Sequence, residues 1–159
     1  MRIDKKGREI PQTMEEKKEV ISFISKVAFS EKGIVRRKII SEVTELQAID
    51  LLKIGIDLQN DNWVHSIETS AIIHTKKNHS DPDKEAQKGQ IAITDKDFFL
   101  IPEILDSYDC LYKSDNKSHA GKNTVLIYEK RFRDITVCYI EEKRDGRKSL
   151  AFHTMYKKI

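Results

Sequence analysis

A ten-residue stretch, 72–81 (IIHTKKNHSD), carries two histidines and two lysines. His74 and His79 are able to exchange protons near neutral pH. Lys76 and Lys77 are suited to attracting a phosphate backbone. The composition of this stretch is compatible with metal binding, nucleic-acid binding or acid–base catalysis. The rest of the sequence is needed to distinguish between these functions.

Metal binding is disfavoured by the spacing of the two histidines. Five residues on a helix place His74 and His79 about 140° apart, whereas a zinc pair on a helix needs the i, i+4 spacing of H-E-x-x-H. The two cysteines, Cys110 and Cys138, lie far from both histidines. Phosphate-binding glycine loops and the G-x-S-x-G elbow are also missing. We therefore expect no metal and no cofactor.

The composition predicts a single domain with a well-solvated surface. The chain has 159 residues, of which 35% are charged, and its net charge is only +3. This charge gives at most a mild bias towards anionic partners. No segment approaches the roughly 20 apolar residues of a membrane span, and the start MRIDKKGREIPQT has no apolar signal region. We expect no membrane partner and a cytoplasmic location, with delivery into a target cell as the alternative.

The N-terminal residues 1–30 are expected to form an arm and a helix ahead of the main domain, 31–159. The first thirteen residues lack periodicity and predict a flexible arm. Thr13 and Glu16 have the spacing of a capping box, and the apolar residues that follow fall at helical intervals. The next segments predict a strand at 34–43 and a helix in ELQAIDLLKIG with Leu46, Ile49, Leu52 and Lys53 on one side. A short strand in DNWVHSI follows, and then a helix from Thr69 or Ser70 that carries both histidines.

The central part of the chain predicts short elements and loops. SDPDKEAQKG predicts a polar loop around Pro82, QIAIT a short strand, and SDNKSHAGKN a second loop. Thr94 or Asp95 is expected to cap a helix in DKDFFLIPEIL that Pro102 kinks or breaks.

Three β-rich runs close the sequence: TVLIYEKRF, ITVCYIEEKR and KSLAFHTMYKK. The short connections RD and DGR are suited to hairpins. Helices followed by paired strands predict an α+β fold, with N-terminal helices packed on a C-terminal antiparallel sheet.

The last strand has a pattern that a binding cleft would show. Strand alternation places Leu150, Phe152, Thr154 and Tyr156 on one face, so an apolar face becomes polar at one end. The simpler interpretation is that Thr154 and Tyr156 are ordinary strand formers.

Other polar residues have structural interpretations. Lys130 shares a face with Leu126 and Tyr128, where a lysine usually extends into water. His65, His119 and His153 are expected to be surface or structural residues, with His153 facing away from Thr154 in a regular strand.

The order of these motifs resembles the barnase–EndoU–colicin–RelE (BECR) group of metal-independent ribonuclease toxins, particularly its phage-associated members. The resemblance rests on IHTKKNH, which matches an H-x-x-x-x-H helix, followed by QIAIT, IPEIL, YEK and LAFHTMYK. It covers roughly residue 34 to the C-terminus. One position departs from the pattern, because Ser80 stands where glycine often follows the second histidine.

This resemblance implies an endoribonuclease that uses the 2′-hydroxyl of RNA as its nucleophile. It nominates His74, His79, Lys130, Thr154 and Tyr156 as catalytic residues. His79 is the expected main acid–base group. It also implies RNA as the partner, with tRNA one candidate, and an acidic antitoxin or immunity protein. Lys76 and Lys77 are expected to attract the RNA.

Two other hypotheses remain open at this point. In the first, the chain has kept the scaffold without the activity, as a nucleic-acid-binding or virion-associated protein, and the Ser80 departure favours this hypothesis. A zinc-dependent hydrolase is the third hypothesis, which metal analysis and chelators would test.

Overall fold

The computed structural model describes residues 1–30, 35–59, 62–115 and 123–159. Its helical elements are α1 (Met14–Ser30), α2 (Glu45–Lys53), α3 (Thr69–His79), α4 (Pro82–Gln87), the 3-10 helix η1 (Asp95–Leu100), α5 (Ile101–Ser107) and the short 3-10 turn η3 (Asp145–Arg147). Its strands are β1 (Arg2–Ile3), β2 (Glu9–Ile10), β3 (Arg37–Glu42), β4 (Val64–Glu68), β5 (Gln90–Ile91), β6 (Cys110–Lys113), β7 (Val125–Phe132), β8 (Ile135–Arg144) and β9 (Ser149–Lys158).

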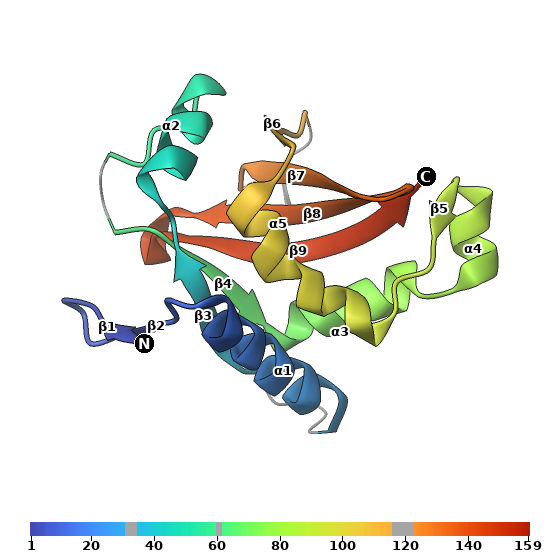
Figure 1. Ribbon diagram of the computed structural model, residues 1–159, viewed down its shortest axis with the longest axis horizontal. Helices are drawn as coiled ribbons and strands as arrows, with labels where there is room; N and C mark the ends of the chain where they lie inside the picture. Colours follow the sequence, from blue (N-terminus) through green and yellow to red (C-terminus); the bar gives the residue numbers. More distant parts are fainter. Residues whose placement is uncertain (31–34, 60–61, 116–122) are drawn as a thin grey trace.

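The main sheet has the strand order β3-β4-β9-β8-β7-β6, and β5 pairs with the end of β9. Strands β7, β8 and β9 form the predicted antiparallel meander. Strand β4 lies parallel to the start of β9, so the sheet is mixed. In Figure 1, α1 and α5 lie in front of this sheet, which confirms the α+β class.

The core fills the space between these helices and one face of the sheet. On β8, Val137, Tyr139 and Glu141 alternate onto this face, and all three are buried. Tyr139 stacks on Phe152 of β9 with ring centroids 5.3 Å apart. Helix α1 adds Ile21, Ile24 and Ala28 to the same core. The N-terminal helix is therefore part of the hydrophobic core.

A bulge in β9 overturns the prediction that Leu150, Phe152, Thr154 and Tyr156 share one face. Pairing with β8 shifts between Ile140 and Glu141, which leaves β9 with one extra residue, His153. Because an inserted residue reverses the alternation, Phe152 faces the core while Thr154 and Tyr156 face the other side. In a regular strand the side chains of His153 and Thr154 would point to opposite faces. At the bulge both contact α3.

The first thirteen residues form a hairpin, β1–β2, where the sequence predicted an arm without structure. The side chain of Asp4 accepts hydrogen bonds from the backbone N–H groups of Lys6 and Arg8, and Gly7 supplies the positive φ of the turn (+76°). Ile10 then anchors the hairpin, since it is only 2% exposed. The predicted capping box is confirmed by reciprocal bonds between Thr13 and Glu16.

One other prediction was wrong in an informative way. The polar segment around Pro82 is helix α4, because Asp81 caps its N-terminus and proline is tolerated in the first turn. The helix predicted in ELQAIDLLKIG is confirmed as α2, with Leu46, Ile49 and Leu52 exposed and with Gln47 and Leu51 buried. Pro102 does end one helix and begin another, between η1 and α5. Residues 116–122, which include His119 and most of the predicted second loop, lie outside the described residues.

Candidate active site

Helix α3 lies beside the part of β9 that has no strand on its outer edge. Strand β4 pairs with residues 149–151 of β9, and β5 pairs with Lys157 and Lys158. Helix α3 runs along the span between them, and Thr75 faces β9 with its hydroxyl 3.3 Å from that of Thr154. Ideal helix geometry places His79 about 40° to one side of Thr75 and His74 about 100° to the other. Both histidines can therefore contact β9, although they are five residues apart.

His79 is held between a tyrosine and a buried carboxylate. Its ring lies 5.8 Å from that of Tyr156, and its Nδ1 is 3.2 Å from Oε2 of Glu85. Glu85 on α4 is fully buried and is also paired with Lys88. If Nδ1 carries the proton of this hydrogen bond, Nε2 is the atom left for proton exchange. Within the described part of the chain, Nε2 of His79 has no hydrogen-bond partner.

His74 lies next to another histidine. Its ring centroid is 5.7 Å from that of His153, the bulged residue of β9. Partial burial lowers the pKa of His74 below its ordinary value of 6.5, and the positive charges of His153, His79 and Lys77 lower it further. A histidine in this environment is mostly neutral at pH 7 and is suited to accept a proton.

Tyr156 and Thr154 stand on the second face of the sheet, next to α3. Tyr156 pairs with Cys138 of β8, and burial together with the neighbouring Cys138 thiol raises the pKa of Tyr156 to about 12. Tyr156 therefore stays protonated at neutral pH and is no base. Its ring packs against the ring of His79. The half-buried Thr154 presents its hydroxyl on the same face of β9 as Tyr156.

The nominated lysines are not brought to this group of side chains. Lys130 alternates onto the opposite face of the sheet from Tyr156, and its Nζ donates to the carbonyl of Ser107 at the end of α5. Lys76 is paired with Asp95 at 2.5 Å, on the side of α3 that faces α1. Lys77 is exposed and close enough to influence the pKa of His74.

Glu85 and His153 are the residues that sequence reasoning missed. Glu85 was placed in a loop, although Asp81 and Pro82 together are a recognisable helix start. Ser80 also has a simple explanation. It adopts φ −108° and ψ −1°, a conformation open to any residue, so the structure has no need of glycine there.

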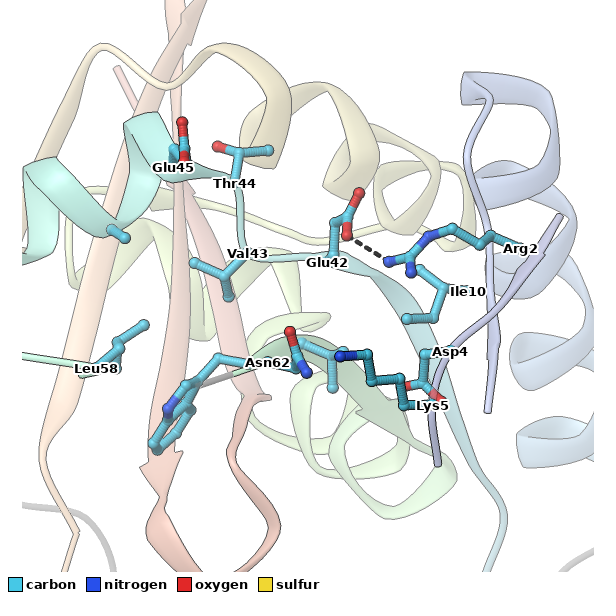
Figure 2. A pocket seen from close by; sticks show the side chains of 13 residues that line it. Arg2, Asp4, Lys5, Ile10, Glu42, Val43, Thr44, Glu45, Leu58 and Asn62 are labelled. Atoms are coloured by element: carbon cyan, nitrogen blue, oxygen red, sulfur yellow. Dashed lines mark hydrogen bonds and ion pairs between the residues drawn. The ribbon is translucent and has the colours of Figure 1, made fainter. Parts of the chain in front are cut away.

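Hollows of the described surface lie elsewhere, away from these histidines. Figure 2 shows one of about 410 Å³ between the N-terminal hairpin and β3, lined by Arg2, Asp4, Lys5 and Glu42 among others. None of the five nominated catalytic residues lines it, and the two histidines lie instead along the seam between α3 and β9. In the described ranges, no three His, Cys, Asp or Glu side chains are grouped to hold a metal ion. Nor do those ranges contain a helix of the length and apolarity needed to cross a bilayer.

The mixed sheet with helices on one face and a histidine-bearing helix at its edge defines an α+β protein of the BECR nuclease class. The chain belongs to the phage-Barnase-EndoU-ColicinE5/D-RelE like nuclease 3 family (PBECR3), which matches residues 38–159. No curated protein and no solved structure matches the chain significantly. The match includes α3 and β9 and leaves out the N-terminal hairpin and α1. The chain is thus a nuclease of the BECR type by family.

Proposed function

We propose that this nuclease is an endoribonuclease that cleaves RNA by attack of a 2′-hydroxyl on the adjacent phosphorus. The observation that carries the proposal is the pair of histidines on one seam, each with a different partner. His74 lies against His153, and His79 is hydrogen-bonded to the buried Glu85. Their different surroundings suit two different proton-transfer roles.

In the proposed reaction His74 is the general base. Its pKa is lowered, first by burial and then by His153, so the neutral imidazole is available to take the 2′-hydroxyl proton. The 2′-oxygen then forms a bond to phosphorus as the bond from phosphorus to the 5′-oxygen breaks. The products are a 2′,3′-cyclic phosphate and a free 5′-hydroxyl.

His79 is the general acid in this scheme. The Glu85 carboxylate faces Nδ1, so a positive charge on the His79 ring is paired, and Nε2 donates its proton to the leaving 5′-oxygen. The two histidines are separated by about 7.5 Å of helix rise, a span into which a phosphate group fits. Thr154 donates a hydrogen bond to a phosphate oxygen, and Tyr156 keeps the His79 ring in place. Lys130 has no part in this scheme, since its ammonium is directed to α5.

The decisive experiment is cleavage of total RNA by the purified chain, with and without EDTA, followed by mapping of the product ends. We expect 2′,3′-cyclic phosphate ends with and without chelator, and a rate about 10²–10⁴-fold lower in His79→Gln. Lys96→Gln on η1 is a matched surface control that should cleave normally. RNA that stays equally intact with wild type and His79→Gln would overturn the proposal, and loss of cleavage with EDTA would favour metal catalysis.

The proposed biological setting is that of a toxin-type nuclease acting on RNA, with tRNA the first substrate to test. A producing cell needs protection from such an enzyme. We therefore propose an acidic antitoxin or immunity protein that covers the seam, and action in the cytoplasm of the producing cell or of a target cell into which the chain is delivered.

A further inference from the structure

A second hollow lies at the start of β9, at the opposite end of this strand from Tyr156. Its lining differs in charge from that of the hollow in Figure 2. It has a volume of about 410 Å³, and no acidic residue lines it. Its lining includes the cationic residues Lys6, Arg8, Arg37, Lys38 and Arg147, together with Ser66 and Ser149. We refer to it as the basic pocket. Such a concentration of cations around serine hydroxyls suits a phosphate group.

The positive charge of the basic pocket is only partly neutralised by its neighbours. Glu68 is paired with three arginines, Arg37, Arg144 and Arg147. Burial alone would raise the pKa of Glu68, but hydrogen bonds from Arg144 and Arg37 outweigh burial and hold that pKa below its usual range. Arg144 is also paired with Glu142, but Arg37 and Arg147, which line the pocket, share the one carboxylate of Glu68, and this leaves an excess of positive charge.

The N-terminal hairpin supplies two of the cations. Asp4 fixes the turn through the backbone of Lys6 and Arg8, and it also pairs with the Arg8 guanidinium at 2.8 Å. A second guanidinium nitrogen of Arg8 donates to the carbonyl of Asn62, which ties the hairpin to the segment before β4. The exposed Lys6 ammonium has no ion-pair partner among the described residues. It is thus available to an anionic ligand.

The basic pocket and the candidate active site are on the same face of the sheet. Pairing with β8 places Ser149 opposite Arg144, Thr154 opposite Ile140, and Tyr156 opposite Cys138. These β8 residues are all even-numbered and share one face, so their partners on β9 share it as well. The bulge at His153 is what makes this alignment possible. Figure 1 shows the hairpin at the left end of the sheet and α4 with β5 at the right.

We infer that the basic pocket is a distal phosphate subsite for a single RNA strand that runs along β9 to the histidines. This inference rests on the proposed ribonuclease function. From Ser149 to Tyr156 the strand spans about 23 Å, which about seven stacked nucleotides would cover. Three of the five cationic residues of the subsite, Lys6, Arg8 and Arg37, precede the family match, which begins at residue 38. The hairpin therefore extends the substrate-binding surface beyond the nuclease domain shared with the family.

Neighbouring residues provide a matched test. Lys6→Gln/Arg147→Gln removes two charges from the basic pocket. Arg2→Gln/Lys5→Gln removes two charges that line the hollow of Figure 2, from the same hairpin. Each double variant also loses one ion pair to a glutamate, Arg147 to Glu68 or Arg2 to Glu42. Binding is measured by fluorescence anisotropy with 2′-O-methyl RNA, which lacks the nucleophilic hydroxyl.

A labelled strand of about fourteen nucleotides should bind the basic-pocket variant about tenfold more weakly than wild type, with a shallower salt dependence. The control variant should bind as wild type does. A probe of about three nucleotides, too short to reach from the histidines to the pocket, should bind all three proteins equally. Equal loss in both double variants, or loss with the short probe, would overturn the inference. If the double variant does not fold, Lys6→Gln alone should weaken long-strand binding about threefold, and unchanged binding would overturn the inference.

Cleavage assays separate this inference from the proposed function. If wild type cleaves RNA but the basic-pocket variant binds and cleaves long strands normally, only the distal subsite is wrong. If wild type binds the long probe through the basic pocket but leaves RNA intact, the catalytic proposal is wrong and a binding role stands.

Discussion

Among the described residues, two histidine–glutamate pairs have the same chemistry and different surroundings. His65 lies 2.8 Å from Glu141, and both side chains are completely buried. His79 lies 3.2 Å from Glu85, but its own side chain is 16% exposed. The comparison shows that a carboxylate partner alone says little about function. What distinguishes the pairs is whether the second ring nitrogen is occupied.

In the His65 pair both ring nitrogens have hydrogen-bond partners. Gln47 donates to the carbonyl of Leu105 and accepts from the N–H of Thr44, so its Oε1 faces His65 Nε2 as an acceptor. His65 therefore carries a proton on Nε2, and Nδ1 shares another with Glu141. This ring holds β4 to β8 and α2 and has no nitrogen left for a substrate. The Nε2 atom of His79, in contrast, has no such partner in the described ranges.

The largest effect expected from this comparison is on stability. His65→Gln cannot fill both hydrogen bonds and leaves the buried Glu141 carboxylate with only the Tyr139 hydroxyl as a partner, so the free energy of unfolding should fall by about 3 kcal/mol or more. His79→Gln should cost only about 1 kcal/mol, because Glu85 keeps its pairing with Lys88. Urea denaturation of both variants measures the difference. Similar losses in the two variants would mean that His79 is as structural as His65.

The next effect concerns catalysis through Glu85, which we regard as a positioning residue. Glu85→Gln removes the carboxylate that orients His79, so kcat for RNA cleavage should fall about tenfold to a hundredfold with KM little changed. Lys88→Gln is the matched control, since it removes the other partner of Glu85 without touching His79. Initial rates over a range of RNA concentrations separate kcat from KM. Equal kcat losses in both variants would indicate a structural role for Glu85.

The sequence predicted the elements of the site better than their orientation. Helix α3 and strand β9 were both expected, because helical spacing and strand alternation are local signals. The face of the sheet predicted for Thr154 was wrong. A bulge such as that at His153 depends on the neighbouring strand and cannot be seen in the alternation of residues along β9 itself. The position of Lys130 relative to Tyr156 also depends on strand register, which the sequence of one strand cannot fix.

The role of each histidine was equally hard to predict from sequence. His65 and His79 are the same residue type, and their glutamate partners lie 76 and 6 residues away in the chain. Only the packing of β4 against β8, and of α4 against the end of α3, identifies which carboxylate each one meets.

The smallest effect that we predict tests the contact between His74 and His153. The rate should rise with pH as His74 loses its proton, with a midpoint below 6.5, because burial and then His153, His79 and Lys77 lower the pKa of His74. His153→Gln removes one nearby positive charge and leaves the burial, so the midpoint should move up towards 6.5 by less than about one pH unit. At pH 5.5 the variant would then be slower than wild type, while at pH 7.5 the two would cleave at similar rates. A pH profile of kcat/KM for both proteins measures this shift, and a midpoint that does not move would show that His74 is not the base whose titration limits the rate.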